Sequence, residues 1–222
     1  MALYLIINTA VEPFGFSLER DGNCLVAIKR YSDRSFSESL LGLIDSHCRL
    51  FDSRLEDIRG IGVINGPGSY TGLRIGVSYA KTLSYTLHCP VVGISSLEAL
   101  AYQVIVQEDV FAIILSAKPG YVYFQLFHRL NDGGVSSVSD LLLIQVEDCF
   151  NLLQGFRCKL SVYICSKLNL FEALLHSYLT IYFIDIACER LFVLLHSKLL
   201  NSSEGSFKHV KLNYICQPKI GS

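Results

Sequence analysis

Residues 65–76, with the sequence NGPGSYTGLRIG, are the part of the chain whose residue types and spacing best fit a chemical role. Gly66, Gly68 and Gly72 follow an apolar run and precede a stretch with helical periodicity. Glycines in such a loop let backbone N–H groups approach an anion with no Cβ in the way, as in phosphate-binding loops. One interpretation of this motif loop is therefore a site for the phosphates of a nucleotide.

The spacing of the motif loop matches neither common nucleotide-binding template. Leu73 stands where a P-loop has its lysine, and Thr71 replaces the third glycine of a dinucleotide-binding loop. The second interpretation is a tight turn between a strand and a helix, with Ser69 or Thr71 as the helix cap. In that case Gly72 and Gly76 serve close packing. Both interpretations stay open on spacing alone, and the candidate site residues are Gly66, Pro67, Gly68, Ser69, Tyr70, Thr71, Gly72 and Arg74.

Other kinds of active site are not indicated by the sequence. It has no G-x-S-x-G nucleophile motif, and its six histidines never stand three to five residues apart, as a metal-binding pair on a helix would. Cys89 follows His88, but side chains of adjacent residues usually point apart. We therefore predict neither a hydrolase site nor a metal site.

The composition is that of a globular chain with an excess of apolar side chains, 51% hydrophobic against 18% charged. Such an excess favours a deep core or a surface that a partner completes. The net charge is −1 and no basic run occurs, so we expect no direct binding to nucleic acid by this chain.

The cysteines and the N-terminus predict the compartment. The eight cysteines form no C-x-x-C pair and lie on apolar segments, so we expect reduced, buried thiols. The N-terminus lacks the basic region of a signal peptide, and no apolar run approaches the ~18 residues of a membrane span. These features predict a cytoplasmic protein without a membrane segment.

Apolar patterning divides the chain into two α/β lobes, residues 1–107 and 108–222. In the first lobe, residues 3–30 alternate around an Asp-Gly turn as a three-strand antiparallel meander. Helical spacing then predicts helices over 35–49 and 71–88. Short apolar runs before and after the second helix predict buried strands, and a further helix ends the lobe.

In the second lobe the boundaries between predicted elements are less clear than in the first. Strands are predicted over 110–117 and 121–130, and a helix over 146–156. Two more helices are predicted over 169–179 and 188–201, around the strand-like run TIYFIDI. We expect the tail that follows to pack back on the first lobe.

The motif loop and the segment PVVGISSLEALA that follows its helix resemble the signature of the TsaB family, also called YeaZ. This family belongs to the bacterial machinery that makes threonylcarbamoyladenosine in tRNA. The resemblance covers residues 1 to about 105 and includes the runs ESLLGLID and LEDIRGIGV. It implies two actin-like, ribonuclease H-like lobes related to the catalytic subunit TsaD.

The resemblance also implies a role. Members of this family are understood as non-catalytic scaffolds that pair with TsaD through helices of the first lobe, and the ATPase TsaE joins the assembly. For this chain the resemblance therefore implies a TsaD-like partner, a TsaE-like ATPase in a larger complex and contact with tRNA only through the complex. It implies no cofactor on this chain, with ATP and a metal held by the partner subunits.

Three departures from the family pattern weaken any case for catalysis. The first strand ends in Asn8-Thr9-Ala10 where the family has Asp-Thr-Ser, so the negative charge of a Mg²⁺ site is lost. Phe36 takes the place of a histidine at the first helix. In the second lobe, Ser116 and Tyr121 stand where the family has an aspartate and a glutamate.

The helices over 35–49 and 71–88 are predicted to contact the partner. The second helix has two apolar stripes, so one can pack on its own sheet while the other needs a second cover. Arg74, in the first turn, is unfavourable at a helix N-terminus unless it is paired, which indicates an anion or a partner carboxylate. The predicted interface residues are Phe36, Leu40, Leu43, Ile44, Leu73, Val77, Ala80 and Leu87.

Two alternatives to the scaffold interpretation remain. One is an actin-fold ATP-binding enzyme, a small kinase or ATPase, that uses the loop from Gly66 to Gly72 for phosphate. The other is a homodimer that buries the same apolar helices. The loss of the charge at Asn8 argues against the enzyme.

Overall fold

The chain forms two compact units in the computed structural model. One unit comprises Met1–Ala99 with Ile186–Ser222, and the other comprises Leu100–Asp185. The structure describes residues 2–31, 34–105, 109–155, 161–165, 180–201 and 210–213, and for residues 34–38, 180 and 181 it describes the backbone alone.

The bounds of these units differ from the predicted lobes of residues 1–107 and 108–222. The second unit begins at Leu100, within helix α3 (Ser96–Gln103), and the chain returns to the first unit at Ile186. The return follows because the last described helix, α5, packs on the strands of the first unit.

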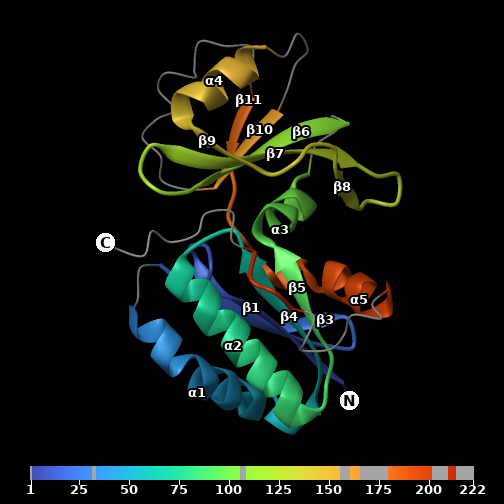
Figure 1. The fold of residues 1–222 in the computed structure, drawn as a ribbon. Helices are drawn as coiled ribbons and strands as arrows, with labels where there is room; N and C mark the ends of the chain where they lie inside the picture. The colour runs from blue at the N-terminus through green and yellow to red at the C-terminus, as the bar shows by residue number, and fades with distance from the viewer. Residues whose placement is uncertain are drawn as a thin grey trace. The chain divides into compact units, whose positions relative to one another are not determined.

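The first unit is built on a five-stranded sheet in the order β3-β2-β1-β4-β5 (Figure 1). Strands β1, β2 and β3 are antiparallel, and β4 and β5 run parallel to β1. The hairpin between β2 and β3 turns at Asp21 and Gly22, whose φ angles of 52° and 81° suit a turn that matches the strand twist. The predicted meander is thus confirmed. The strands are β1 (Leu3–Asn8), β2 (Phe14–Arg20), β3 (Asn23–Arg30), β4 (Ile58–Gly66) and β5 (Val91–Ser95).

Helices cover both faces of this sheet (Figure 1). On β4, Ile61 and Val63 lie in the core cluster with buried residues of α1 and α2. Gly60 and Gly62 alternate with them and face α5, since a Cβ at Gly62 would lie 3.3 Å from Leu195 Cδ1. The two first-lobe helices predicted from spacing are confirmed. The helices are α1 (Arg34–Leu50), α2 (Tyr70–Leu87) and α5 (Phe192–Asn201), with short 3₁₀ helices η1 (Leu55–Asp57) and η3 (Cys188–Arg190).

A buried carboxylate joins α5 to the sheet. Glu19 Oε2 lies 2.8 Å from His196 Nε2, and Glu19 Oε1 accepts the backbone N–H of Gly22 at 2.7 Å. The His196 ring also meets Tyr4 edge to face, with ring centroids 4.3 Å apart. Because a buried carboxylate is costly without such partners, these contacts favour the docked position of α5.

The second unit repeats the topology of the first. Its path is β11-β10-β6-β7-β8, with β9 also paired to β7. Strands β6 and β7 are antiparallel, while β10 and β11 run parallel to β6, as β4 and β5 do to β1. The fold is therefore the predicted pair of mixed α/β, actin-like lobes. The elements are β6 (Val110–Ser116), β7 (Tyr121–Arg129), β8 (Val135–Ser137), β9 (Leu142–Gln145), α4 (Val146–Gln154), β10 (Ser161–Cys165) and β11 (Thr180–Phe183).

Two details of the second unit differ from the predictions or lie beyond them. The short strand β8 was not predicted, because three residues are too few to show alternation. The predicted helix over 169–179 lies outside the described residues. Within the described ranges, no helix combines the length and apolar character that crossing a bilayer requires.

Most described cysteines are core residues, as predicted, but Cys24 is exposed on β3. Desolvation on burial raises the pKa of Cys48 and Cys89 to about 11. The same cause raises the pKa of Cys149 and Cys165 to about 12. At neutral pH these thiols are therefore protonated and poor nucleophiles. Cys158 and Cys216 lie outside the described residues.

A pulse of iodoacetamide on the native protein at pH 8 should modify Cys24 faster than Cys48 by at least about tenfold, because Cys24 is exposed and Cys48 is buried. Peptide mass spectrometry would measure both rates in one sample. Denaturant provides the control, since unfolding should bring the two rates together. Equal rates in the native protein would contradict the burial of Cys48.

Candidate functional site

Asn8, at the end of β1, is fully buried and organises the loop that follows it. Its Nδ2 donates to the carbonyl oxygens of Val11 and Pro13, at 2.8 and 3.0 Å. Its Oδ1 accepts the backbone N–H groups of Ala10 and Val11, at 3.1 and 3.2 Å. A carboxylate could not donate to the two carbonyls, so asparagine suits this loop where an aspartate would not. Every polar atom of the side chain is engaged within the chain.

The glycines after β4 face the chain's own backbone. A Cβ on Gly68 would lie 2.5 Å from the carbonyl oxygen of Ala10, and one on Gly72 would lie 1.8 Å from that of Thr9. A Cβ on Gly76 would lie 2.2 Å from Thr9 Oγ1. The three glycines are thus required where the start of α2 crosses the loop after β1.

Two hydrogen bonds join the loop after β1 to the start of α2, and a third caps the helix. The backbone N–H of Ser69 donates to the carbonyl oxygen of Ala10 at 2.8 Å. Thr9 Oγ1 donates to the carbonyl oxygen of Gly72 at 2.7 Å, and the N–H of Gly72 donates to Ser69 Oγ at 3.2 Å. Of the two predicted caps, Ser69 is the one that caps α2.

A segment near the C-terminus, residues 210–213, lies against the beginning of the motif loop. The N–H of Asn213 donates to the carbonyl oxygen of Asn65 at 2.8 Å, and Asn65 Nδ2 donates to that of Lys211 at 3.0 Å. Gly66 has a φ of 120°, and a Cβ there would lie 2.6 Å from the carbonyl oxygen of Asn213. The first glycine of the motif is therefore also approached by the chain itself.

These contacts do not fit a nucleotide-phosphate cradle. Such a cradle keeps the space beside its glycines for an anion, whereas here carbonyl oxygens of Thr9, Ala10 and Asn213 take that space. Asn8 has no oxygen left for a metal-bound nucleotide. The geometry supports the second interpretation, a strand-to-helix junction built for close packing.

The remaining residues of the motif reach the surface. Tyr70 and Arg74 are exposed in the first turns of α2. Arg74 Nη1 lies 3.3 Å from the Tyr70 hydroxyl, and the guanidinium carbon lies 5.5 Å from the centre of the Tyr70 ring. Pro67 follows Gly66 in a cis peptide bond and is buried.

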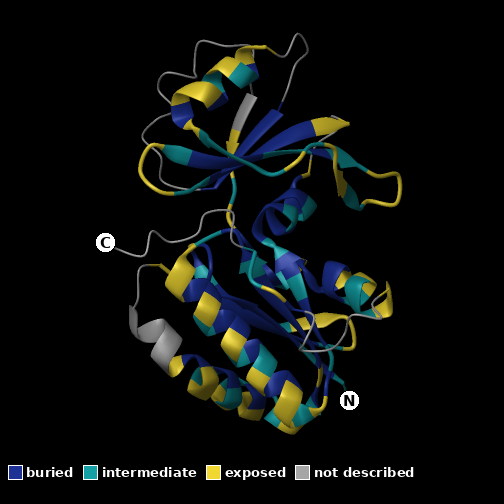
Figure 2. Ribbon diagram, in the orientation of Figure 1, coloured by how far each residue is buried: buried dark blue, intermediate teal, exposed yellow. Residues whose placement is uncertain are grey.

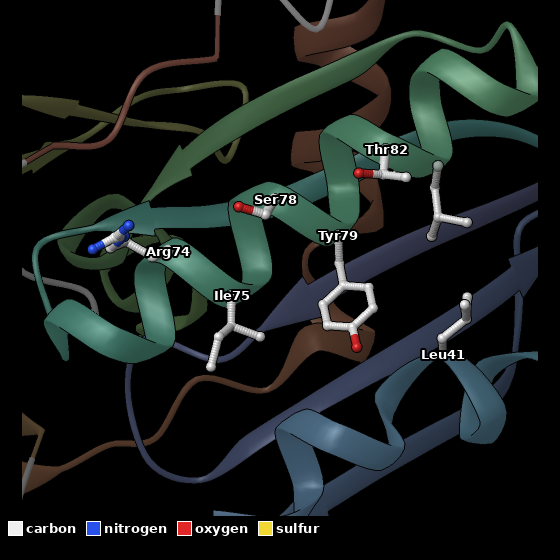
Figure 3. A pocket seen from close by; sticks show the side chains of 7 residues that line it. Leu41, Arg74, Ile75, Ser78, Tyr79 and Thr82 are labelled. Carbon is white, nitrogen blue, oxygen red and sulfur yellow. The ribbon is translucent and has the colours of Figure 1, made fainter.

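A groove of about 450 Å³ runs between α1 and α2 on the outer side of the first unit. Leu41 of α1 points toward α2, and Ile75 and Tyr79 of α2 point toward α1 (Figure 3). The outer sides of both helices are exposed (Figure 2). The residues that line the groove are Leu41, Arg74, Ile75, Ser78, Tyr79, Thr82 and Leu83.

The structure corrects the predicted interface residues. Five of them are buried in the chain's own core, so they present no surface to a partner: Leu40, Ile44, Leu73, Val77 and Ala80. Leu43 and Leu87 are half-buried and pack against the same core. The side chain of Phe36 lies outside the described residues.

The reason for this correction is that α2 has two apolar stripes. The stripe through Val77 faces the sheet, and the stripe through Ile75 and Tyr79 faces the groove. Periodicity shows that both stripes exist, but only the register of α2 on its sheet decides which one is buried. The signal that could have found the groove is Leu41, which widens the apolar stripe of α1 beyond one face.

No group of three or more His, Cys, Asp or Glu side chains lies close enough to hold a metal ion among the residues that the structure describes.

Comparison with known proteins points to one family. The family model described as "TsaD: tRNA N6-adenosine threonylcarbamoyltransferase" matches residues 29–153, more than half of the chain. The "tRNA threonylcarbamoyladenosine biosynthesis protein TsaB" of Bacillus subtilis (strain 168) is 34% identical over 127 residues, which cover 57% of this chain and 56% of that protein. The protein of the same name from Escherichia coli (strain K12) is 28% identical over 131 residues, which cover 58% and 56%.

The structural comparison agrees in fold. "YeaZ from Pseudomonas aeruginosa" superposes with a TM-score of 0.76 at 18% identity, covering 97% of this chain and 100% of that one. At this level of identity the likeness concerns the fold. In sequence, the chain spans about half the length of the curated relatives it matches.

Replacing Gly72 with alanine should lower the free energy of unfolding by about 2–4 kcal/mol, because the new Cβ would overlap the carbonyl oxygen of Thr9. Gly42→Ala is the matched control. Gly42 lies in the interior of α1 with nothing within 4 Å of its Cβ position, so alanine there should stabilise by about 0.5–1 kcal/mol. Urea denaturation followed by circular dichroism measures both. A Gly72→Ala variant as stable as the wild type would disprove the crossing.

Replacing Asn65 with alanine should release residues 210–213 from the motif loop, since the hydrogen bond to Lys211 is lost. Hydrogen exchange in peptides that contain residues 66–72 and 210–213 should become faster. Asn23→Ala is the control, because Asn23 Nδ2 also donates to a carbonyl oxygen, that of Asp21, but in an exposed turn. If both variants leave exchange at these peptides unchanged, the segment does not hold the loop.

Proposed function

The chain belongs to the TsaD family, and from this premise we propose that it is a non-catalytic, TsaB-like subunit that pairs with a TsaD-like catalytic subunit. The names of the matched relatives support a role in tRNA threonylcarbamoyladenosine biosynthesis. The subunit would act by stabilising its partner, as a scaffold, and would perform no chemistry of its own.

The observation that carries this proposal is the engagement of the motif loop within the chain. The glycines that would face a phosphate face carbonyl oxygens of Thr9, Ala10 and Asn213. Asn8 uses both of its polar atoms to shape the neighbouring loop. A site whose anion-binding parts serve internal packing supports a structural role better than a catalytic one.

The groove between α1 and α2 is the surface that we assign to the partner. It combines an apolar floor, including Leu41 and Ile75, with an exposed position on the first unit. Apolar surface of this kind gains stability when a second protein covers it. Two helices that flank a groove also offer the geometry in which a partner helix can pack.

The rest of the proposed assembly follows from the family. We expect a TsaE-like ATPase to join the complex, tRNA to be contacted only through the complex, and ATP and metal to be held by the partner subunits. The site of action would be the cytoplasm. In this assembly the chain would contribute its fold and the groove, and the other subunits would supply the ligand sites.

The experiment compares two matched substitutions on α1. Leu41, 39% exposed, lines the groove, whereas Leu50, 73% exposed, lies at the end of the same helix and outside the groove. Calorimetry of the purified chain with the cognate TsaD-like subunit should show binding that Leu41→Glu weakens by about a hundredfold, because a desolvated charge would face the apolar floor. Leu50→Glu should bind like the wild type.

Absence of binding by the wild type, or equal binding by Leu41→Glu, would refute the scaffold proposal. A second titration with ATP and Mg²⁺ tests the alternative, an ATP-binding enzyme that uses the loop from Gly66 to Gly72. Tight binding by the chain alone would favour that enzyme.

A further inference from the structure

The wall of the groove contributed by α2 consists of two parallel rows of side chains. Ile75 and Tyr79 lie one turn apart and point toward α1, where they form the floor with Leu41 (Figure 3). Arg74, Ser78 and Thr82 also follow one another at four-residue intervals and are exposed along the rim. Two of the three rim side chains are small, so another helix can approach α2 closely along this row.

The charge along the rim is confined to one end. Arg74 lies at the N-terminal end of the groove, and of the described residues lining it, Arg74 alone is charged. Its guanidinium contacts the phenol of Tyr70, and within the described parts of the chain no carboxylate forms an ion pair with it. The groove is thus apolar along its length with a cation at one end.

The length of the groove limits what it can hold. From Arg74 to Leu83, α2 advances nine residues, which at a rise of 1.5 Å per residue is about 14 Å. A partner helix lying along this length would place about two and a half turns in it. Such a segment presents apolar residues at positions i, i+3 or i+4, and i+7.

We propose that the groove receives an amphipathic helix of the TsaD-like subunit whose carboxylate, at one end of the apolar face, pairs with Arg74. This assignment rests on the proposed function and adds the chemistry of the partner segment to it. The guanidinium and a carboxylate can form a bidentate pair, and the Tyr70 ring holds the guanidinium at the end of the groove. The carboxylate therefore sets the direction and register of the bound helix, while the apolar residues supply most of the affinity.

A protein helix suits this surface better than RNA does. RNA binding depends on several cations that neutralise successive phosphates, and the floor of this groove is apolar. One cation beside apolar side chains matches one carboxylate beside apolar side chains. A second copy of this chain is the other candidate for the groove, and the experiment below separates it from the TsaD-like subunit.

The test measures the affinity of the chain for the purified TsaD-like subunit by calorimetry at about 50 mM and about 500 mM NaCl, where screening differs strongly. Arg74→Gln should weaken binding roughly tenfold at low salt, and the difference from the wild type should shrink to about twofold at high salt. Arg74→Lys should recover part of the loss, because lysine restores the positive charge but not the planar guanidinium that pairs with a carboxylate through two hydrogen bonds. Arg59→Gln is the control, since it removes the same charge from an exposed arginine on β4 and should bind like the wild type.

The outcomes separate this inference from the proposed function. If Arg74→Gln binds like the wild type while Leu41→Glu does not bind, the groove is the interface but the carboxylate is absent, and the inference is overturned. If the wild type does not bind the TsaD-like subunit, both proposals fail. If light scattering shows a dimer of the chain alone that Arg74→Gln dissociates, and binding to the TsaD-like subunit is unaffected, the occupant is a second copy and the inference is also overturned.

Discussion

The crossing of the loop after β1 by the start of α2 is the constraint on which the first unit depends. The carbonyl oxygens of Thr9 and Ala10 lie where side chains on Gly72 and Gly68 would begin, so only glycine allows the two backbones to approach this far. The Ser69 cap and the bond from Thr9 Oγ1 to the carbonyl of Gly72 then fix the direction of α2. Because that direction decides which stripe of α2 meets the sheet, it also decides which stripe is left to form the groove.

The same constraint explains why the motif loop can be taken for a phosphate site. A glycine is required wherever an oxygen atom comes close to the Cα, whether that oxygen belongs to a phosphate or to a carbonyl group. The residue pattern of the loop therefore predicts a close oxygen without saying whose it is. Here the oxygens belong to Thr9, Ala10 and Asn213. Asn8 likewise serves the chain's own loop, because its amide donates two hydrogen bonds to backbone carbonyls that an aspartate could not donate.

Patterns that depend on neighbours in the chain could be predicted from the sequence, whereas choices made by distant contacts could not. The meander follows from alternation around Asp21 and Gly22, and the ends of α2 follow from its apolar period and its serine cap. The burial of Val77 instead of Ile75 could not be predicted, because both stripes are apolar and the register on the sheet selects between them. The return of α5 to the first unit could not be predicted either, because the sequence predicts such a return only for the tail that follows this helix. It depends on the space beside Gly60 and Gly62, which α5 fills from far along the sequence.

A shared origin with a catalytic fold and a scaffold role are compatible because the two uses draw on the same backbone. In this chain the loop after β1 and the loop after β4 lie in contact, because carbonyl oxygens of Thr9 and Ala10 fill the space beside Gly72 and Gly68. Two hydrogen bonds, from the N–H of Ser69 and from Thr9 Oγ1, also join the two loops, and together these contacts fix where α2 begins on its sheet. A rigid helix presents its outer row, from Arg74 to Thr82, in one orientation, so a partner meets a preformed surface and orders less on binding. The close packing of the two loops therefore fills the space beside the glycines and also fixes the surface that we propose for the partner.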